Sequence, residues 1–239
     1  MTPGLDLAAK RAASLDLLRS VRDRFAPAEI VVAWTGGKDS TVALDLWRTV
    51  LKEGLAESQS GRARVLNLDT GLKFPEVVAF RDTLARDWDL DLIIARPGLD
   101  LAAYPVARDK AACCRDLKIA PLSAALARHS VRALITGVRR DEHPSRAGRK
   151  RLEDRVWDNG QACLEVNPIL DWTEMDVWSH IAEAGLPYCS LYGQGYRSLG
   201  CMPCTVLPTG GTGAGEDERA GRDPDKEAQL GLLRDLGYF

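Results

Sequence analysis

The sequence lacks an excess of charge of either sign, because 32 Lys and Arg face 34 Asp and Glu and leave a formal net charge of −2. A protein that binds nucleic acid or an anionic membrane by general attraction carries a basic excess. We therefore expect no DNA partner, and an anionic ligand has to be held by local groups. The sequence also lacks an apolar run as long as a membrane span and an N-terminal signal-peptide pattern. We expect a cytoplasmic protein with no membrane partner.

Cysteine is present, with six residues, and in a reducing compartment such residues are more often ligands, nucleophiles or core residues than disulfides. Cys113 and Cys114 are adjacent where we expect a helix to open, and Cys201 and Cys204 form a CxxC pair. Together they indicate a four-thiolate metal site. Adjacent helical residues diverge by about 100°, which is awkward for one small tetrahedral ion. An iron–sulfur cubane has spread iron corners, so we favour a [4Fe–4S] cluster, with zinc second and a disulfide third.

The other two cysteines, Cys163 and Cys189, lie outside this set. Cys163 falls in an expected strand and Cys189 in a loop after a proline. Each is interpreted as a small apolar residue rather than a nucleophile.

Short apolar runs alternate with amphipathic segments along most of the chain. We expect strands at 29–33, 64–68, 90–95 and 132–136, and helices at 5–25, 39–51, 75–88 and 120–129. This alternation predicts an α/β fold, a doubly wound and mainly parallel sheet with helices on both faces. Residues 1–206 would form a nucleotide-binding domain that carries the four cysteines. Residues 207–239, rich in glycine and charge, would form a flexible C-terminal lid with a short helix at 226–236.

A glycine-containing turn joins the first strand to the helix that follows it. Such a turn presents unpaired backbone N–H groups at the positive end of the helix dipole, which suits phosphate. It is not the common P-loop, because Val32 stands where that motif needs glycine and an acidic residue follows the lysine. The alternative is a plain strand–turn–helix connection. The residues of this loop are Thr35, Gly36, Gly37, Lys38, Asp39 and Ser40.

Two further groups follow expected strands, at the edge where an open α/β sheet binds ligands. Asp69-Thr70-Gly71 follows the second strand and could orient a ribose hydroxyl or a metal ion, or could be a simple strand-end turn before Pro75. Arg139, Arg140 and Arg146 follow the fourth strand, where guanidinium groups could bind phosphate or sulfate at two points, unless the loop is merely solvated. Arg219 and Arg222 could close on an anion from the tail.

With these residues in place, the chain resembles the phosphoadenosine phosphosulfate reductase family over nearly its whole length. The matching segments are Gly36–Ser40, Asp69–Gly71, Phe74–Glu76, Cys113–Lys118, Pro121–Leu122, Arg139–Arg140, Asn167–Pro168, Asp171–Thr173, Gly195–Thr205 and Glu216–Arg222. The four cysteines are typical of its adenylyl-sulfate reductase branch, which carries a [4Fe–4S] cluster.

The resemblance implies a fold like that of the adenine-nucleotide alpha-hydrolases. It also implies reduction of adenylyl sulfate, or its 3′-phosphorylated form, to sulfite and AMP (or PAP) in sulfate assimilation, with a thioredoxin-like reductant. By position, Lys118, Arg219 and Arg222 would lie near the sulfate. These reductases attack the sulfur with a thiolate on a C-terminal Glu-Cys-Gly-Leu-His segment, whereas no cysteine follows Cys204 here. Cys163, Cys189 or an external thiol would have to substitute, or the chemistry differs.

Some residues resemble a sister family, the small subunit of ATP sulfurylase, which transfers adenylyl from ATP to sulfate and releases pyrophosphate. These include Lys38, Lys73-Phe74 and Arg139-Arg-Asp-Glu142, although that subunit lacks the four cysteines. The alternative function is therefore ATP-dependent adenylyl transfer, including thiolation through an activated intermediate. A third is a non-catalytic nucleotide-binding subunit with a structural metal. The sequence leaves open the choice of nucleotide, the electron donor and whether a homo-oligomer or a partner subunit is involved.

Overall fold

A six-stranded sheet runs through the middle of the molecule, with strand order β3-β2-β1-β4-β6-β5. The computed structural model describes residues 6–53, 61–157, 159–208 and 217–235. The strands are β1 (Ile30–Ala33), β2 (Arg64–Leu68), β3 (Asp91–Ala95), β4 (Ala133–Ile135), β5 (Leu152–Val156) and β6 (Ala162–Val166). Neighbouring strands are parallel except at β5, which pairs antiparallel with β6. The predicted mainly parallel sheet is confirmed, and the four predicted strands match β1 to β4.

Strand β1 is an inner strand because its side chains are apolar on both faces. All four of its residues are buried, and β2 and β4 flank it, with Val32 opposite both Val65 and Ile135. The β5–β6 hairpin was predicted only in part, through the strand at Cys163. Strand β5 is a polar edge strand with alternating exposure, so it lacks the continuous apolar run that marks the inner strands.

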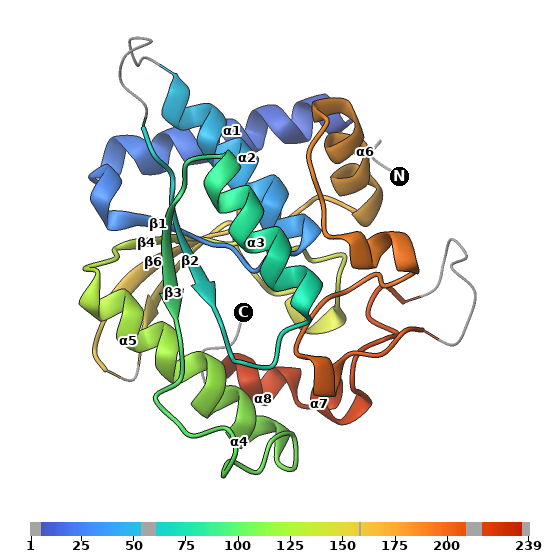
Figure 1. Cartoon of the computed structure of the whole chain (residues 1–239). Coiled ribbons are helices and arrows are strands. Elements are labelled where there is room, and N and C mark those ends of the chain that lie inside the picture. Colours follow the sequence, from blue (N-terminus) through green and yellow to red (C-terminus); the bar gives the residue numbers. More distant parts are fainter. Residues whose placement is uncertain (1–5, 54–60, 158, 209–216, 236–239) are drawn as a thin grey trace.

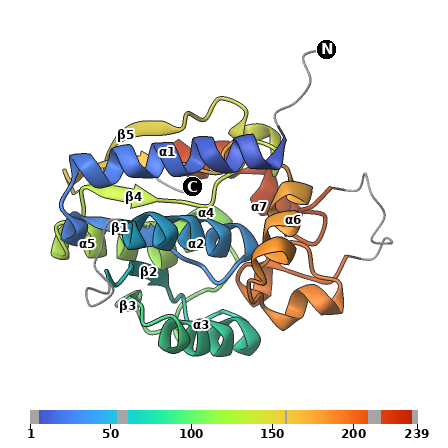
Figure 2. The ribbon, with the colours of Figure 1, turned by 90° about the horizontal axis from the view of Figure 1, so that it is seen from above.

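Helices cover both faces of the sheet (Figures 1 and 2). On one face lie α1 (Leu7–Arg24), α2 (Lys38–Lys52) and α3 (Pro75–Asp87), side by side, with α6 (Glu174–Ala184) packed against α2. On the other face lie α4 (Lys110–Cys114) and α5 (Ala120–Arg128), joined by a π-helical turn, Arg115–Ile119. Two apolar cores result, one against each face of the sheet.

The start of α6 follows from its sequence. Thr173 is its N-cap and Asp176 completes a capping box, with both reciprocal hydrogen bonds formed, at 3.1 and 2.7 Å. Gly185, at φ +61°, ends the helix in the left-handed conformation that glycine adopts without strain.

The C-terminal segment packs on the α4 side of the molecule. Thr205 and Arg222 form an antiparallel bridge, and α7 (Pro224–Ala228) and α8 (Leu230–Asp235) both contact α4. The single helix predicted at 226–236 is wrong, since two short helices meet at Gln229. The glycine-rich part of the predicted lid, 209–216, and the last residues, 236–239, lie outside the described residues. The division into 1–206 and 207–239 stays a prediction.

Among the helices of the described ranges, none combines the length and the apolar character that crossing a membrane requires.

Candidate nucleotide and cysteine site

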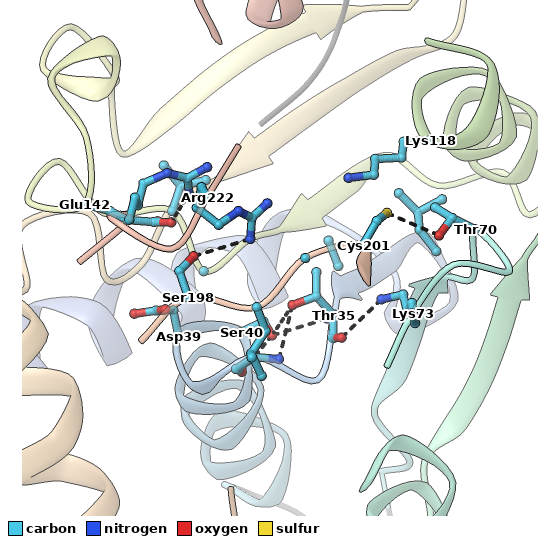
Figure 3. A pocket seen from close by; sticks show the side chains of 18 of the residues that line it. Thr35, Asp39, Ser40, Thr70, Lys73, Lys118, Glu142, Ser198, Cys201 and Arg222 are labelled. Atoms are coloured by element: carbon cyan, nitrogen blue, oxygen red, sulfur yellow. Dashed lines mark hydrogen bonds and ion pairs between the residues drawn. The ribbon is translucent and has the colours of Figure 1, made fainter. Parts of the chain in front are cut away.

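A cavity of about 170 Å³ opens at the carboxyl ends of β1, β2 and β4 (Figure 3). Parallel strands bring the loops that follow them to one edge of the sheet. The strand order reverses at β1, because β2 and β3 lie on one side of it and β4, β6 and β5 on the other. The wall includes Thr35, Gly37, Asp39, Ser40, Thr70, Lys73, Lys118, Gly137, Glu142, Arg146, Tyr192, Ser198, Gly200, Cys201, Arg219 and Arg222. Segments far apart in the sequence therefore share one wall.

The loop after β1 is held in shape by its own hydroxyls. Gly36 has φ +84°, and Ser40 Oγ accepts from the Thr35 N–H at 3.2 Å and donates to the Gly37 carbonyl at 3.0 Å. Behind the loop, a Cβ on Gly137 would stand 2.6 Å from the backbone nitrogen of Ser40. Only glycine after β4 lets the start of α2 come this close.

Two of the cations expected to hold an anion are instead buried and paired. Lys38 Nζ lies 2.5 Å from Glu218 Oε1, and Arg139 Nη2 lies 2.5 Å from Glu218 Oε2. Both cations also contact Asp39, at 3.2 and 2.6 Å. Neither Lys38 nor Arg139 is on the cavity wall. Burial alone would lower the pKa of Lys38, but Asp39, Tyr192 and Glu218 together raise it above its ordinary value.

In the turn after β2, one polar side chain is bound within the protein and another lines the cavity. Asp69 accepts from the Gly71 N–H at 3.1 Å and from Arg81 and Arg96, each at 3.2 Å. Burial would raise the pKa of Asp69, but these hydrogen bonds hold it below its ordinary range. Asp69 is therefore engaged within the protein, as the strand-end turn alternative expected. Thr70 does face the cavity, and its Oγ1 lies 3.3 Å from Cys201 Sγ.

Some of the predicted arginines line the cavity and others do not. Arg140 pairs with Asp171 and lies off the cavity wall. Arg146 and Arg219 line the cavity, and both pair with the carboxylate of Glu142. Although burial alone would raise it, these two guanidiniums keep the pKa of Glu142 well below its usual range. Glu142 is thus a fixed negative charge between two cations.

Arg222 is the best placed of the arginines to receive an anion. It lies on the wall, 5% exposed, with Nη1 3.4 Å from Ser198 Oγ (Figure 3). Its buried Nε has no hydrogen-bond partner in the part of the chain that the structure describes. A buried donor of this kind costs free energy unless a ligand or water takes it up.

The four cysteines of the predicted metal site line one small cavity beside the first, together with Lys118 and Lys226. Cys201 and Lys118 belong to both cavities. The expectation that Cys113 and Cys114 open a helix is wrong, because they end α4 and the helical path continues through the π-turn into α5.

The four thiols line one cavity without forming a closed metal site. Among residues 6–53, 61–157, 159–208 and 217–235, no group of three or more His, Cys, Asp or Glu is placed to hold a metal ion. Cysteine thiolates are ligands of both zinc and iron–sulfur clusters.

The environments of the thiols differ. Burial would raise the pKa of Cys201, but Lys118, Thr70 and Lys226 outweigh it and lower the pKa to about 7. Burial raises the pKa of Cys163 to about 12 and also raises that of Cys189. Both are core residues that line neither cavity. Both cysteines therefore lie in the core as small apolar residues, in agreement with the interpretation from the sequence.

Several wall residues were not singled out as site residues from the sequence. Four of them line the cavity: Lys73, Glu142, Tyr192 and Ser198. A fifth residue, Glu218, does not line it but contacts Lys38. Lys73 and Glu142 lie in the segments that follow β2 and β4, which is the signal that could have found them. Tyr192 and Glu218 reach the loop after β1 from distant segments and carry no local signal.

Comparison with known proteins gives consistent results. The phosphoadenosine phosphosulfate reductase domain model matches residues 29–207. The adenosine 5'-phosphosulfate reductase of Mycolicibacterium smegmatis is 35% identical over 207 residues, which cover 82% of this chain and 84% of that protein. The phosphoadenosine 5'-phosphosulfate reductase of Gloeobacter violaceus is 32% identical over 202 residues, which cover 81% and 77%.

Solved structures share the fold at low identity. The phosphoadenylyl-sulfate reductase of Candida auris, in a phosphate complex, has TM-score 0.64 and 19% identity and covers 86% of this chain and 100% of that one. The FMN adenylyltransferase of Candida glabrata, in complex with FAD and pyrophosphate, has a TM-score of 0.68 and 17% identity. The match covers 99% of this chain and 86% of that one. At these identities the likeness shows the fold alone, and it confirms the expected adenine-nucleotide alpha-hydrolase-like class.

Proposed function

The chain belongs to the phosphoadenosine phosphosulfate reductase family, and from that premise we propose that it reduces adenylyl sulfate, or its 3′-phosphorylated form, to sulfite and AMP (or PAP). One observation carries the proposal: Lys118, Arg222 and Cys201 all line the cavity at the carboxyl ends of β1, β2 and β4. We place the reaction in cytoplasmic sulfate assimilation, on the way to cysteine.

In this proposal the loops after β1 and β2 hold the adenylate, and the cationic wall holds the sulfate. Lys118, Arg219 and Arg222 supply ammonium and guanidinium donors, and Arg222 Nε offers a buried donor without a protein partner among the described residues. Guanidinium groups bind tetrahedral oxyanions at two points. These side chains would neutralise the sulfate and so favour attack by an anionic thiolate.

The reduction needs two thiols. A thiolate attacks the sulfur, the sulfur–oxygen bond to the phosphate breaks, and AMP leaves with that electron pair. A second thiol then attacks the resulting S-sulfo group, releasing sulfite and leaving a disulfide. Because Cys163 and Cys189 are buried away from the cavity, we assign both thiols to an external reductant of the thioredoxin type.

We further propose that Cys113, Cys114, Cys201 and Cys204 hold a [4Fe–4S] cluster. The donor set fits, since four thiols line one cavity and two lysines line it with them. When bound, the cluster would supply a local electrostatic field beside the sulfate. Lys118, which lines both cavities, would link the thiolate set to the substrate anion.

The proposal is tested on chain purified anaerobically, with iron and acid-labile sulfide measured first. Adenylyl sulfate, its 3′-phosphorylated form and ATP are then assayed in parallel with thioredoxin. We expect sulfite and AMP (or PAP) from a sulfated nucleotide and no pyrophosphate from ATP. Lys118→Met should reduce sulfite formation by about 100-fold, a few kcal/mol of lost charge stabilisation. The exposed Lys52→Met is the matched control and should have no effect.

Two outcomes would contradict the proposal. Pyrophosphate release from ATP, with no sulfite from either sulfated nucleotide, would establish adenylyl transfer instead. Nucleotide binding without turnover, despite intact iron and sulfide, would establish a non-catalytic subunit.

A further inference from the structure

The carboxylate of Glu218 lies between two cations, Lys38 after β1 and Arg139 after β4. Its two carboxylate oxygens are divided between Lys38 and Arg139, each at 2.5 Å. All three side chains are buried: Lys38 is 1% exposed, Arg139 is 0% and Glu218 is 8%. Such two-point contact with an ammonium and a guanidinium is also what a phosphate group takes from a protein.

The start of a helix lies at the same place. Lys38 is the first residue of α2, a helix of 15 residues, and the N-terminal end of a helix dipole favours a negative charge nearby. Lys38 and Arg139 are not on the cavity wall, and both contact Glu218, which is not on the wall either. The cations that remain on the wall are Lys73, Lys118, Arg146, Arg219 and Arg222.

We propose that Glu218 is a specificity-determining residue: its carboxylate fills the subsite of Lys38 and Arg139 and thereby excludes nucleotides and anions that carry a pyrophosphate group. A single phosphate joined to a sulfate can be held by the cations of the cavity wall. A triphosphate, or inorganic pyrophosphate, needs charge compensation for the additional phosphate, and the subsite that would give it is already neutralised. The same chain segment that brings Arg219 and Arg222 to the wall therefore closes the neighbouring subsite.

Displacing Glu218 is unfavourable because its charge is buried. Burial raises the pKa of Glu218, so it is stabilised as an anion only by the cations it contacts. Removing it leaves Lys38 with Asp39 and the Arg197 carbonyl, each at 3.2 Å. Arg139 keeps Asp39 at 2.6 Å and Asp141 at 3.2 Å, so Asp39 is then the one carboxylate that contacts both buried cations among the described residues. In the wild-type protein, pyrophosphate can enter the subsite only if it displaces Glu218, which is unfavourable. In a variant without the carboxylate, pyrophosphate would instead supply the negative charge that Lys38 and Arg139 lack.

The test measures binding of inorganic pyrophosphate by calorimetry, so it does not depend on the proposed reduction. Glu218→Gln keeps the shape of the side chain and removes its charge, and we expect at least about tenfold tighter binding of pyrophosphate than in the wild type. In Glu218→Gln combined with Lys38→Met this gain should disappear. Sulfite assays on the same preparations report separately on the reductase proposal.

A matched control separates an opened subsite from a loosened tail. Asp223 pairs with Lys110 at 2.7 Å, and neither residue lines the cavity, so Asp223→Asn weakens the same tail without freeing Lys38 or a cation of the wall and should leave pyrophosphate affinity unchanged. No gain in Glu218→Gln, or an equal gain in Asp223→Asn, would overturn the proposal. If Glu218→Gln does not fold, Glu218→Asp takes its place. Its carboxylate is one methylene too short to bridge both cations, so we expect about threefold tighter pyrophosphate binding, and no gain would equally overturn the proposal.

Discussion

The hydroxyl of Tyr192 accepts a hydrogen bond from the backbone N–H of Lys38 at 2.9 Å, across 154 residues of sequence. Tyr192 lies in a short 3₁₀ helix, Ser190–Gln194, after α6, and its ring meets Trp178 edge to face at 5.3 Å. The first amide of α2 is thus held by an aromatic residue from the second half of the chain. This contact fixes the loop that borders the candidate nucleotide site.

Removing that hydroxyl should lower stability modestly. Tyr192→Phe keeps the ring but leaves the buried Lys38 N–H without its acceptor, so we expect the free energy of unfolding to fall by about 1 kcal/mol. Tyr188 packs on the same Trp178 at 5.3 Å but is 49% exposed, and Tyr188→Phe serves as the control with a change of less than about 0.5 kcal/mol. Urea unfolding measures both. Equal effects would mean that the Lys38 contact contributes nothing specific.

A methyl group on Gly200 should displace Arg222. A Cβ there would stand 2.6 Å from Arg222 Cζ, inside the space of the guanidinium. We expect Gly200→Ala to raise the KM for the sulfated nucleotide by about tenfold, because a side chain that should bind the anion moves. Gly98 has no atom within 4 Å of such a Cβ, and Gly98→Ala should behave as wild type. A KM unaffected in Gly200→Ala would remove Arg222 from the proposed sulfate contacts.

Loss of one cysteine ligand should be visible in the iron content. Cys114→Ser removes one thiol of the cysteine cavity, and we expect iron to fall from about four atoms per chain to below one after anaerobic gel filtration. Cys163→Ala alters a buried thiol outside that cavity and should keep the iron. Zinc in the wild type, with no acid-labile sulfide, would contradict the cluster assignment.

The start of α6 should lose stability in acid. Burial would raise the pKa of Asp176, but Lys10 and Thr173 outweigh it and hold the pKa below the ordinary 3.8. A lowered pKa means that the stabilisation is present above pH 3.8 and is lost as the pH falls through the folded-state value. Asp176→Asn should therefore be about 1–2 kcal/mol less stable than wild type near neutral pH, and the difference should shrink below that pH. A difference that is constant down to pH 2 would refute this account.

The sequence predicted the inner part of the sheet because those strands carry their own signal. Ile30–Ala33 is apolar on both faces, and Gly36 and Gly37 mark the turn after it. It also predicted that Cys113, Cys114, Cys201 and Cys204 belong together, since thiol spacing is a chemical pattern independent of the fold. Strand β5 was not predicted, because an edge strand such as Leu152–Val156 carries charged residues, and its sequence resembles that of a loop.

The partners of the buried charges could not be predicted from local sequence. Lys38 and Arg139 were expected to face a ligand, but their partner Glu218 lies 180 and 79 residues away along the chain. Which carboxylate neutralises which cation depends on how the tail returns to the sheet. No periodicity or motif around Lys38 encodes that return.

The position of β1 inside the sheet has a consequence for biosynthesis. A ribosome releases Ile30–Ala33 early, yet Ala133, which pairs with Ile30, follows only after roughly 5–20 seconds of further elongation. Until then one edge of the most apolar strand stays open, available to neighbouring nascent chains. Weaker induction of expression should therefore favour soluble yield, since fewer half-made sheets coexist at any moment.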